Sequence, residues 1–185
     1  AEMGDDKYQQ EFECSFNAPV EGAYYSSIIN DLDERKQIID IPKDELARTY
    51  TGWDLGISDS TSIWVAQLVN KEIRLIDFVE ELGTGKSRKE ILEEAGLNIT
   101  IASKLTIMDG IASARKILPR CWFDKDKTKQ GLDALRNYRR VFDEKRNVFH
   151  DRPFHDWASH ASDAFRYLAV GLDESPMEAW SKPLE

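Results

Sequence analysis

The chain has 185 residues and a formal net charge of −9, and 41% of its residues are hydrophobic while 32% are charged. These values are typical of a soluble globular protein with one hydrophobic core, or one core and an extension. No run approaches the roughly 20 apolar residues that a membrane span needs, so we expect no membrane partner. The two cysteines, Cys14 and Cys121, are far apart and lack metal-ligand spacing, which favours reduced thiols in an intracellular protein.

The charge is unevenly distributed along the chain. Residues 1–50 hold 12 acidic and 5 basic side chains, whereas residues 125–152 hold 9 basic and 5 acidic ones. The acidic total argues against a strong stand-alone nucleic-acid binder, while the basic segment is compatible with a patch that faces a polyanion. A solvated helix face explains the same segment equally well.

The first 48 residues are an acidic lead-in without an evident catalytic motif. Residues 26–34 predict a short helix, and residues 38–41 an extended segment that ends at Pro42. We expect residues 1–48 to be an arm packed on the domain, or the end of a linker from an upstream domain. The domain itself is expected over residues 49–172, followed by a loose tail at 173–185.

Residues 50–79 predict three β-strands separated by short turns. The β-rich runs lie at 50–55, 63–69 and 71–79, an arrangement typical of an antiparallel meander. Alternation puts Gly52 and Asp54 on the same face of the first strand. Because the second strand is apolar on both faces, we expect it to be covered on both sides, inside a layered α/β domain.

Asp54 is the first candidate functional residue. It lies near the end of a strand predicted to be in the middle of the sheet, where a carboxylate is costly unless a charged group meets it. A divalent cation is one such group. The alternative is an ordinary turn, in which Asp54 and Asp59 form hydrogen bonds with the local backbone.

The next segment contains a second candidate, Asp109. The pattern predicts a helix at 88–95, short strands at 97–101 and 105–108, and a helix from Asp109 to Leu118. Asp109 stands where a strand gives way to a helix. That position favours a helix N-cap, and it is also where α/β folds place functional side chains.

Two amphipathic helices are predicted after it. The first covers residues 129–142, and its polar faces and exit carry candidate phosphate contacts: Arg136, Arg139, Arg140, Lys145 and Arg146. The second covers residues 155–172, with a wide apolar stripe on one side and Asp156, His160, Asp163 and Tyr167 on the other. Such a polar stripe either faces solvent or forms a site.

Several motifs together resemble the C-terminal nuclease domain of tailed-bacteriophage large terminase subunits. The motifs lie at residues 53–59, 61–64, 81–88, 118–124 and 155–167, and they read WDLGISD, TSIW, ELGTGKSR, LPRCWFD and HDWASHASDAFRY. The resemblance covers roughly residues 10–172. It implies an α/β, ribonuclease H-like fold, with a central mixed sheet (an antiparallel three-strand meander plus parallel strands) flanked by helices.

The resemblance also implies an activity, the metal-dependent cutting of concatemeric double-stranded DNA during packaging. Asp54 and Asp163 match the carboxylates at the two flanks of the family's metal site, and Asp59 and His160 are candidates to support these carboxylates by contact. In that chemistry two ions about 4 Å apart activate a water and stabilise the leaving oxygen. Oxygen ligands with open positions suit Mg²⁺ or Mn²⁺.

One departure from the family pattern concerns the remaining metal ligand. The family supplies another carboxylate at the end of a fourth, parallel strand, but here Glu80 and Glu81 adjoin where a few tens of residues are expected. Asp109 is the best-placed substitute, because it follows a β-like run.

The resemblance implies several partners: double-stranded DNA, the N-terminal packaging ATPase domain of the same subunit, the small terminase and the portal protein, all in the host cell cytoplasm. Two other functions stay open. One is a fragment of an actin-like phosphotransferase, although that architecture repeats the unit twice and 185 residues hold only one. The other is a non-catalytic docking module of the packaging motor.

Overall fold

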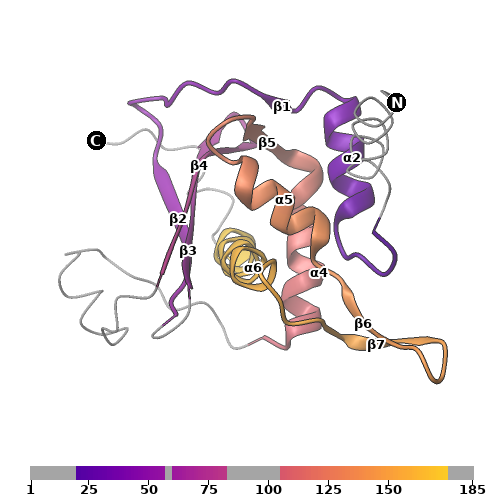
Figure 1. Cartoon of the computed structure of the whole chain (residues 1–185). Coiled ribbons are helices and arrows are strands. Elements are labelled where there is room, and N and C mark those ends of the chain that lie inside the picture. The colour runs from indigo at the N-terminus through magenta and orange to yellow at the C-terminus, as the bar shows by residue number, and fades with distance from the viewer. Residues whose placement is uncertain (1–19, 57–59, 83–104, 175–185) are drawn as a thin grey trace, which may run out of the picture.

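A five-stranded mixed sheet forms the frame of the molecule (Figure 1). The computed structural model describes residues 20–56, 60–82 and 105–174. In spatial order the strands are β1 (Ile38–Ile39), β5 (Cys121–Asp124), β4 (Glu72–Leu82), β3 (Ser60–Val69) and β2 (Thr49–Asp54).

The predicted meander is confirmed. β2 pairs antiparallel with β3, and β3 with β4. Asn70 and Lys71 connect β3 to β4 with φ angles of 51° and 71°, as tight hairpin turns require. β5 pairs in parallel with β4 and with β1, so the sheet is mixed and the predicted α/β class is confirmed.

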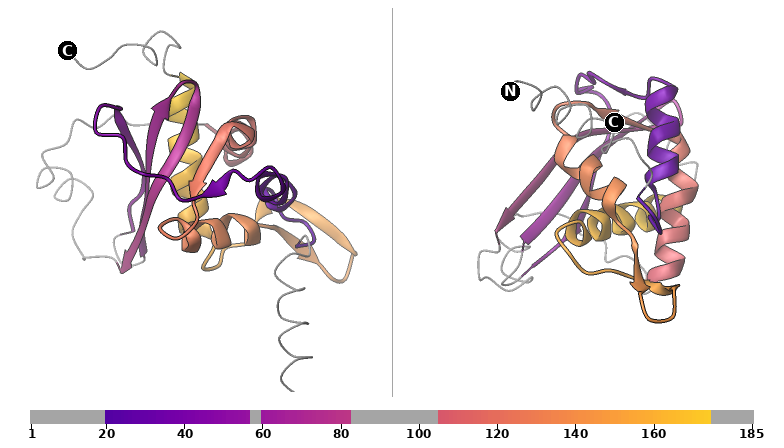
Figure 2. Two further views of the ribbon diagram at one scale, coloured as in Figure 1. Left: turned by 90° about the horizontal axis from the view of Figure 1, so that it is seen from above. Right: turned by 45° about the vertical axis from the view of Figure 1, so that its right-hand side comes forward.

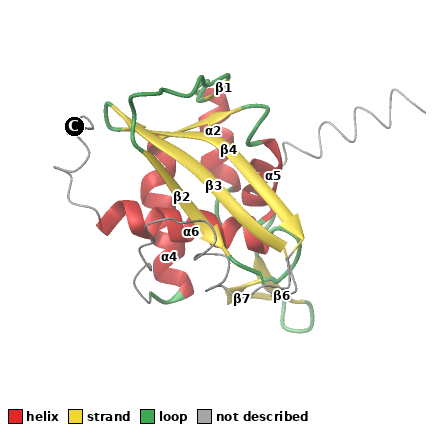
Figure 3. Ribbon diagram, turned by 90° about the vertical axis from the view of Figure 1, so that its left-hand side faces the viewer, coloured by secondary structure: helices red, strands yellow, loops and turns green. Residues whose placement is uncertain are grey.

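The helices lie on one side of the meander in the described part of the chain. They are α2 (Ser26–Glu34), α4 (Ile107–Ile117), α5 (Lys129–Asn137) and α6 (Ser159–Glu174), with a short 3-10 helix η1 (Leu118–Arg120). In Figure 3 the strands face the viewer and the helices lie behind them. On the opposite face Val79 is 39% exposed, so the described residues alone do not supply the cover expected on that side. The first strand, β2, also lies at an edge of the described sheet rather than in its middle, because β5 joins beside β4.

Trp64 of β3 is the centre of the core. Its ring lies 4.7 Å from that of Phe78 and 5.5 Å from that of Phe165, measured between centroids. Its indole nitrogen donates a hydrogen bond of 2.8 Å to the carbonyl of Ala161 on α6. Gly131 brings α5 against the same ring, since a Cβ at that position would lie 2.5 Å from the indole. One side chain therefore sets the distance of two helices from the sheet.

The predicted strand at 105–108 is wrong, because helix α4 already begins at Ile107. Thr106 is its N-cap, and the Thr106 side chain accepts a hydrogen bond from the backbone amide of Asp109. The helix predicted at residues 26–34 is confirmed as α2. The predicted elements at 88–95 and 97–101 lie outside the described residues.

The predicted helix at 129–142 is correct only as far as Asn137. Its last predicted turn instead enters a hairpin of β6 (Arg140–Asp143) and β7 (Val148–Pro153), which extends from the body of the molecule in both views of Figure 2. Tyr138 is buried against Tyr24 and Tyr25, with ring centroids 5.2 and 5.8 Å away. Burying this ring in an extended backbone conformation ends the helix, a tertiary contact that helical spacing does not reveal.

The last helix begins later than predicted. α6 starts at Ser159, after a local turn in which Asp156 accepts the amide of Ala158 and Ser159 Oγ accepts the amide of Asp156. Trp157 therefore precedes the helix and is 55% exposed, instead of joining the apolar stripe. Among the described residues, no helix is long and apolar enough to cross a membrane.

Candidate functional site

Close packing between β2 and α6 creates the site. A Cβ at Gly52 would lie 2.4 Å from Cβ of Leu168 and 2.7 Å from the carbonyl oxygen of Ala164, so only glycine allows this approach. Asp54 is two residues further along the same face of β2 and therefore points toward α6 as well. The first turns of α6 carry His160 and Asp163, three residues apart and thus on one helix face.

Asp54 and His160 are in direct contact. Nδ1 of His160 lies 3.1 Å from Oδ2 of Asp54, and the two side chains are 20% and 17% exposed. An ionised carboxylate only accepts hydrogen bonds, so Nδ1 of the imidazole carries the hydrogen. His160, a candidate partner of the carboxylate cluster, is therefore in contact with Asp54, and its part in metal binding stays a prediction.

Asp163 is held by two neighbours through one oxygen. The hydroxyl of Tyr138 donates to Oδ1 at 3.2 Å, and the guanidinium of Arg166 donates to the same oxygen from Nε at 3.3 Å and from Nη2 at 3.1 Å. Burial and the nearby Asp163 charge raise the pKa of Tyr138, which keeps its hydroxyl protonated as a donor. No described residue donates to Oδ2 of Asp163, and this side chain is 29% exposed.

A third carboxylate stands in the same row of the sheet. Asp54 pairs with Ser62 on β3, and Ser62 pairs with Glu80 on β4, so all three side chains point to the helix side. Ser62 Oγ donates to Oε1 of Glu80 at 3.1 Å, and Gln130 Nε2 donates to Oε2 at 2.8 Å. No three His, Cys, Asp or Glu side chains of the described residues are close enough to hold one metal ion between them.

Asp109 has a structural role at the start of α4. Thr106 Oγ1 donates to its Oδ2 at 2.6 Å, and the Asp109 amide donates back to Thr106 Oγ1 at 3.1 Å. This reciprocal pair holds the Thr106 cap in place at an exposed helix N-terminus. Whether Asp109 also binds a metal stays a prediction. Asp59 lies outside the described residues.

Asp124 ends the parallel strand β5 but is committed to the backbone. Burial alone raises the pKa of this carboxyl, yet hydrogen bonds from the amides of Lys127, Ile41 and Asp126 outweigh it and leave the pKa below its usual range. The side chain is 4% exposed. These bonds tie the segment after β1 to the turn before α5, and they leave the carboxylate no role at the site.

The five basic residues predicted to contact DNA do not share one helix. Arg136 pairs with Asp133 on α5 at 3.4 Å, and Arg139 pairs with Asp156 at 2.9 Å. Arg140 lies over the ring of Tyr24, and Arg146 at the hairpin pairs with Asp143 at 3.9 Å. Lys145, also on the hairpin, is exposed.

Solved structures are similar to this chain. The large terminase from the thermophilic bacteriophage D6E, in complex with ADP, aligns over 80% of the chain with a TM-score of 0.60 and 18% identity. The large terminase nuclease from thermophilic phage G20c with bound magnesium aligns over 82% of the chain, with a TM-score of 0.54 and 15% identity. This chain has the ribonuclease H-like fold of terminase nucleases. No protein-family model and no curated protein matches it.

The extent of these alignments places the likeness in one domain of the terminase. The chain spans 45% of the D6E large terminase but 98% of the G20c terminase nuclease. The nuclease domain of the P22 large terminase is covered to 94%, with a TM-score of 0.51 and 9% identity. At these identities the terminase likeness establishes the fold alone.

The sequence patterns missed the residues that hold the site carboxylates. Tyr138 was predicted on the apolar face of a helix, and Arg166 was not singled out, although its spacing of three from Asp163 predicts an ion pair on one helix face. The place of Glu80 beside Asp54 could be predicted only with the register of the paired strands. Counting outward from the turn at Asn70 and Lys71 pairs β3 with β4, but the bulge between Val65 and Ala66 shifts that count by one residue.

Proposed function

We propose that this chain is the metal-dependent endonuclease domain of a viral DNA-packaging terminase, and that it hydrolyses phosphodiester bonds of concatemeric double-stranded DNA. The observation that carries the proposal is the meeting of Asp54 from β2 with His160 on the first turn of α6, one turn from Asp163. These residues lie where α6 packs on β2. Solved terminase nucleases with this fold contain bound magnesium or cobalt.

The side chains at the site fit a hard divalent cation. Asp54, Asp163 and Glu80 offer carboxylate oxygens, the ligands that suit Mg²⁺ and Mn²⁺. Mg²⁺ keeps several waters and is commonly bound through one or two carboxylates plus substrate phosphates, so a closed cage of three ligands is not needed before substrate binds. Such ions supply an activated water and stabilise the leaving oxygen.

The chain's own residues would orient these carboxylates. His160 holds one oxygen of Asp54, and Tyr138 and Arg166 hold Oδ1 of Asp163, which leaves Oδ2 for a ligand. Partners of this kind fix the orientation of metal ligands. No nucleophilic side chain is required, since the attacking group is water.

Glu80 is our candidate for the third carboxylate, because it shares the Asp54 row of the sheet. Asp109 is the alternative that the sequence suggested. Matched substitutions separate the two: Glu80→Gln should reduce metal-dependent cleavage, whereas Asp109→Asn should leave it unchanged and only weaken the start of α4. The reverse result would assign the third ligand to Asp109.

The remaining partners follow from the same proposal. Lys145 on the β6–β7 hairpin is a candidate phosphate contact. The predicted contacts Arg136, Arg139, Arg140 and Arg146 would reach DNA only by exchanging their present contacts. The packaging ATPase domain of the same subunit, the small terminase and the portal would localise the domain on DNA in the host cytoplasm. Affinity of the isolated domain for DNA should be weak and salt-sensitive.

The deciding experiment is cleavage of plasmid DNA with Mn²⁺, Mg²⁺ or EDTA by the parent chain, Asp54→Asn and Asp163→Asn. We expect nicking and linearisation that need the metal and disappear in both variants. Circular dichroism checks that both variants fold. Full cleavage by either folded variant would remove that carboxylate from the proposal. Absence of cleavage by the folded parent with any metal would favour a non-catalytic docking module, the reading that the lack of a three-ligand cluster among described residues supports.

A further inference from the structure

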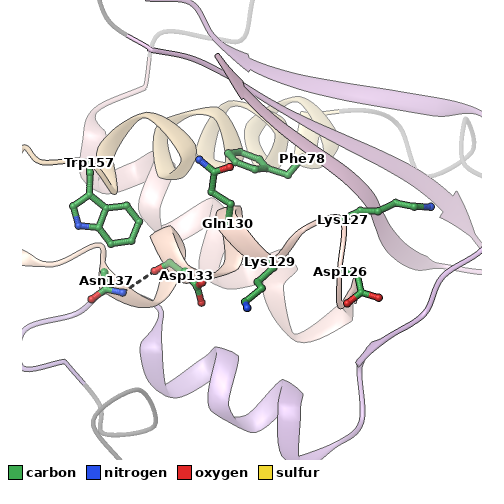
Figure 4. A pocket seen from close by; sticks show the side chains of 8 residues that line it. All are labelled: Phe78, Asp126, Lys127, Lys129, Gln130, Asp133, Asn137 and Trp157. Atoms are coloured by element: carbon green, nitrogen blue, oxygen red, sulfur yellow. Dashed lines mark hydrogen bonds between the residues drawn. The ribbon is translucent and has the colours of Figure 1, made fainter. Parts of the chain in front are cut away.

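A groove runs along α5 beside the candidate site, from the turn before the helix to Asn137 at its end (Figure 4). Its volume is about 590 Å³, within the roughly 300–1,000 Å³ of ligand sites. Phe78 forms part of its wall, and Trp157 lines its far end. Gln130 joins the groove to the site, since its amide donates to Glu80. Trp157, at one end of the groove, is three residues before His160. The groove therefore contacts Glu80 through Gln130 and lies near the start of α6 through Trp157.

The groove carries two available cations. Lys127 and Lys129 line it, both are exposed, and neither forms an ion pair with another described residue. Of the two acids along the groove, Asp133 is paired with Arg136, which leaves Asp126 as the opposing carboxylate. The arginines predicted to contact DNA are less available than these two lysines, because most of the arginines already have an acidic or aromatic partner. Accessible positive charge therefore lies in this groove as well as at Lys145 on the hairpin.

Trp157 adds an exposed aromatic surface to the same groove. Its side chain is 55% exposed, although the residues on either side of it, Asp156 and Ala158, are held by a hydrogen-bonded turn. Sites for single-stranded nucleic acid combine a positively charged groove with an aromatic side chain on which bases stack. A paired base inside a duplex has no free face for such stacking.

We infer that this groove, defined by Lys127, Lys129, Gln130 and Trp157, binds an unpaired segment of the DNA strand next to the bond to be cut. One base stacks on Trp157, while the two lysines contact backbone phosphates. The inference rests on the proposed function for the location of the scissile bond. Under this inference the domain binds a locally unpaired strand and not only an intact duplex.

The test measures binding of a fluorescent oligothymidine to the whole 185-residue chain in EDTA, where cleavage is absent. Trp157→Ala should weaken binding about tenfold, and Trp157→Phe should restore most of it. The double variant Lys127→Ala/Lys129→Ala should lower the slope of log K against log salt by about 1.4, since each phosphate contact on a single strand contributes about 0.7. A role in folding alone would not change that slope.

A matched control makes the result specific. Lys43→Ala/Lys125→Ala removes the same charge outside the groove, from lysines that pair with Glu45 and Asp40. This control should keep the parent's salt slope. If the groove double variant keeps the parent's salt slope, or if Trp157→Ala binds within twofold of the parent, the inference is overturned.

Failure of this inference is distinguishable from failure of the nuclease proposal. Plasmid cleavage that depends on Asp54 and Asp163, together with unchanged oligothymidine binding by the groove variants, would overturn only the groove. A parent chain that does not bind oligothymidine would also overturn the groove, whatever its cleavage activity.

Discussion

Asp54 and His160 are 106 residues apart in the chain, yet Oδ2 of one lies 3.1 Å from Nδ1 of the other. Asp54 comes from the edge strand β2 and His160 from the first turn of α6. The contact fixes one carboxylate oxygen and the tautomer of the ring. It therefore couples the sheet to the helix that carries Asp163.

Because of this contact, we expect substitution of His160 to change the metal concentration that cleavage requires. His160→Ala should raise the Mn²⁺ concentration for half-maximal plasmid cleavage by about 10–100-fold, because loss of a ligand's partner typically weakens metal binding by that factor. His150→Ala is the matched control, since His150 lies 3.7 Å from Asp143 on the β6–β7 hairpin. Equal metal dependence of the two variants would show that His160 does not orient Asp54 for metal binding.

The two tyrosine hydroxyls near Asp163 should have opposite effects on stability. Tyr138 donates to Asp163, so Tyr138→Phe should lower the free energy of unfolding by about 1–2 kcal/mol and weaken metal-dependent cleavage. The hydroxyl of Tyr25 is buried and has no hydrogen-bond partner among the described residues, so Tyr25→Phe should leave stability unchanged or raise it by about 1 kcal/mol. Urea unfolding measures both changes. A larger loss in Tyr25→Phe than in Tyr138→Phe would contradict this assignment of partners.

A methyl group at position 52 should disrupt the close packing of α6 on β2. Gly52→Ala places a Cβ against Leu168 and the backbone of Ala164, so the free energy of unfolding should fall by about 1–3 kcal/mol or more. Cleavage should fall with it, because the helix that carries His160 and Asp163 must move. Gly171→Ala on α6 meets nothing within 4 Å and should instead stabilise by about 0.5–1 kcal/mol. Thermal unfolding of the two variants gives the comparison, and a neutral Gly52→Ala would refute the tight contact.

The carboxyl group of Asp124 should make part of the free energy of unfolding depend on pH. Three backbone amides lower the pKa of its carboxyl despite burial, so its ionised form stabilises the folded chain. That stabilisation is fully present above the unfolded pKa of about 3.9 and is lost as the pH falls through the lower folded pKa. Asp124→Asn should therefore cost about 1–3 kcal/mol near pH 7 and much less below about pH 4. Asp126→Asn, an exposed neighbour, should change stability little at either pH, and a pH-independent cost of Asp124→Asn would argue against this role.

Local patterns were sufficient for much of the fold. Alternating apolar residues and the turn at Asn70 and Lys71 predicted the meander, and helical spacing predicted α2 and most of α6. These features depend on residues close in sequence. The end of α5 was not predicted by local patterns. The burial of Tyr138 against Tyr24 and Tyr25 outweighs the helical periodicity of residues 138–142.

The sequence by itself determined the fold class and the candidate carboxylates Asp54 and Asp163. Strand alternation, helical periodicity and the motifs that resemble terminase nucleases can all be recognised from neighbouring residues in the chain. Only the tertiary structure decided which groups surround these carboxylates. The register across β2, β3 and β4 brings Glu80 into the Asp54 row, and packing of α6 on Gly52 brings His160 to Asp54. Contacts between residues 25 to 106 positions apart depend on register and packing distance, and neither is encoded in local periodicity.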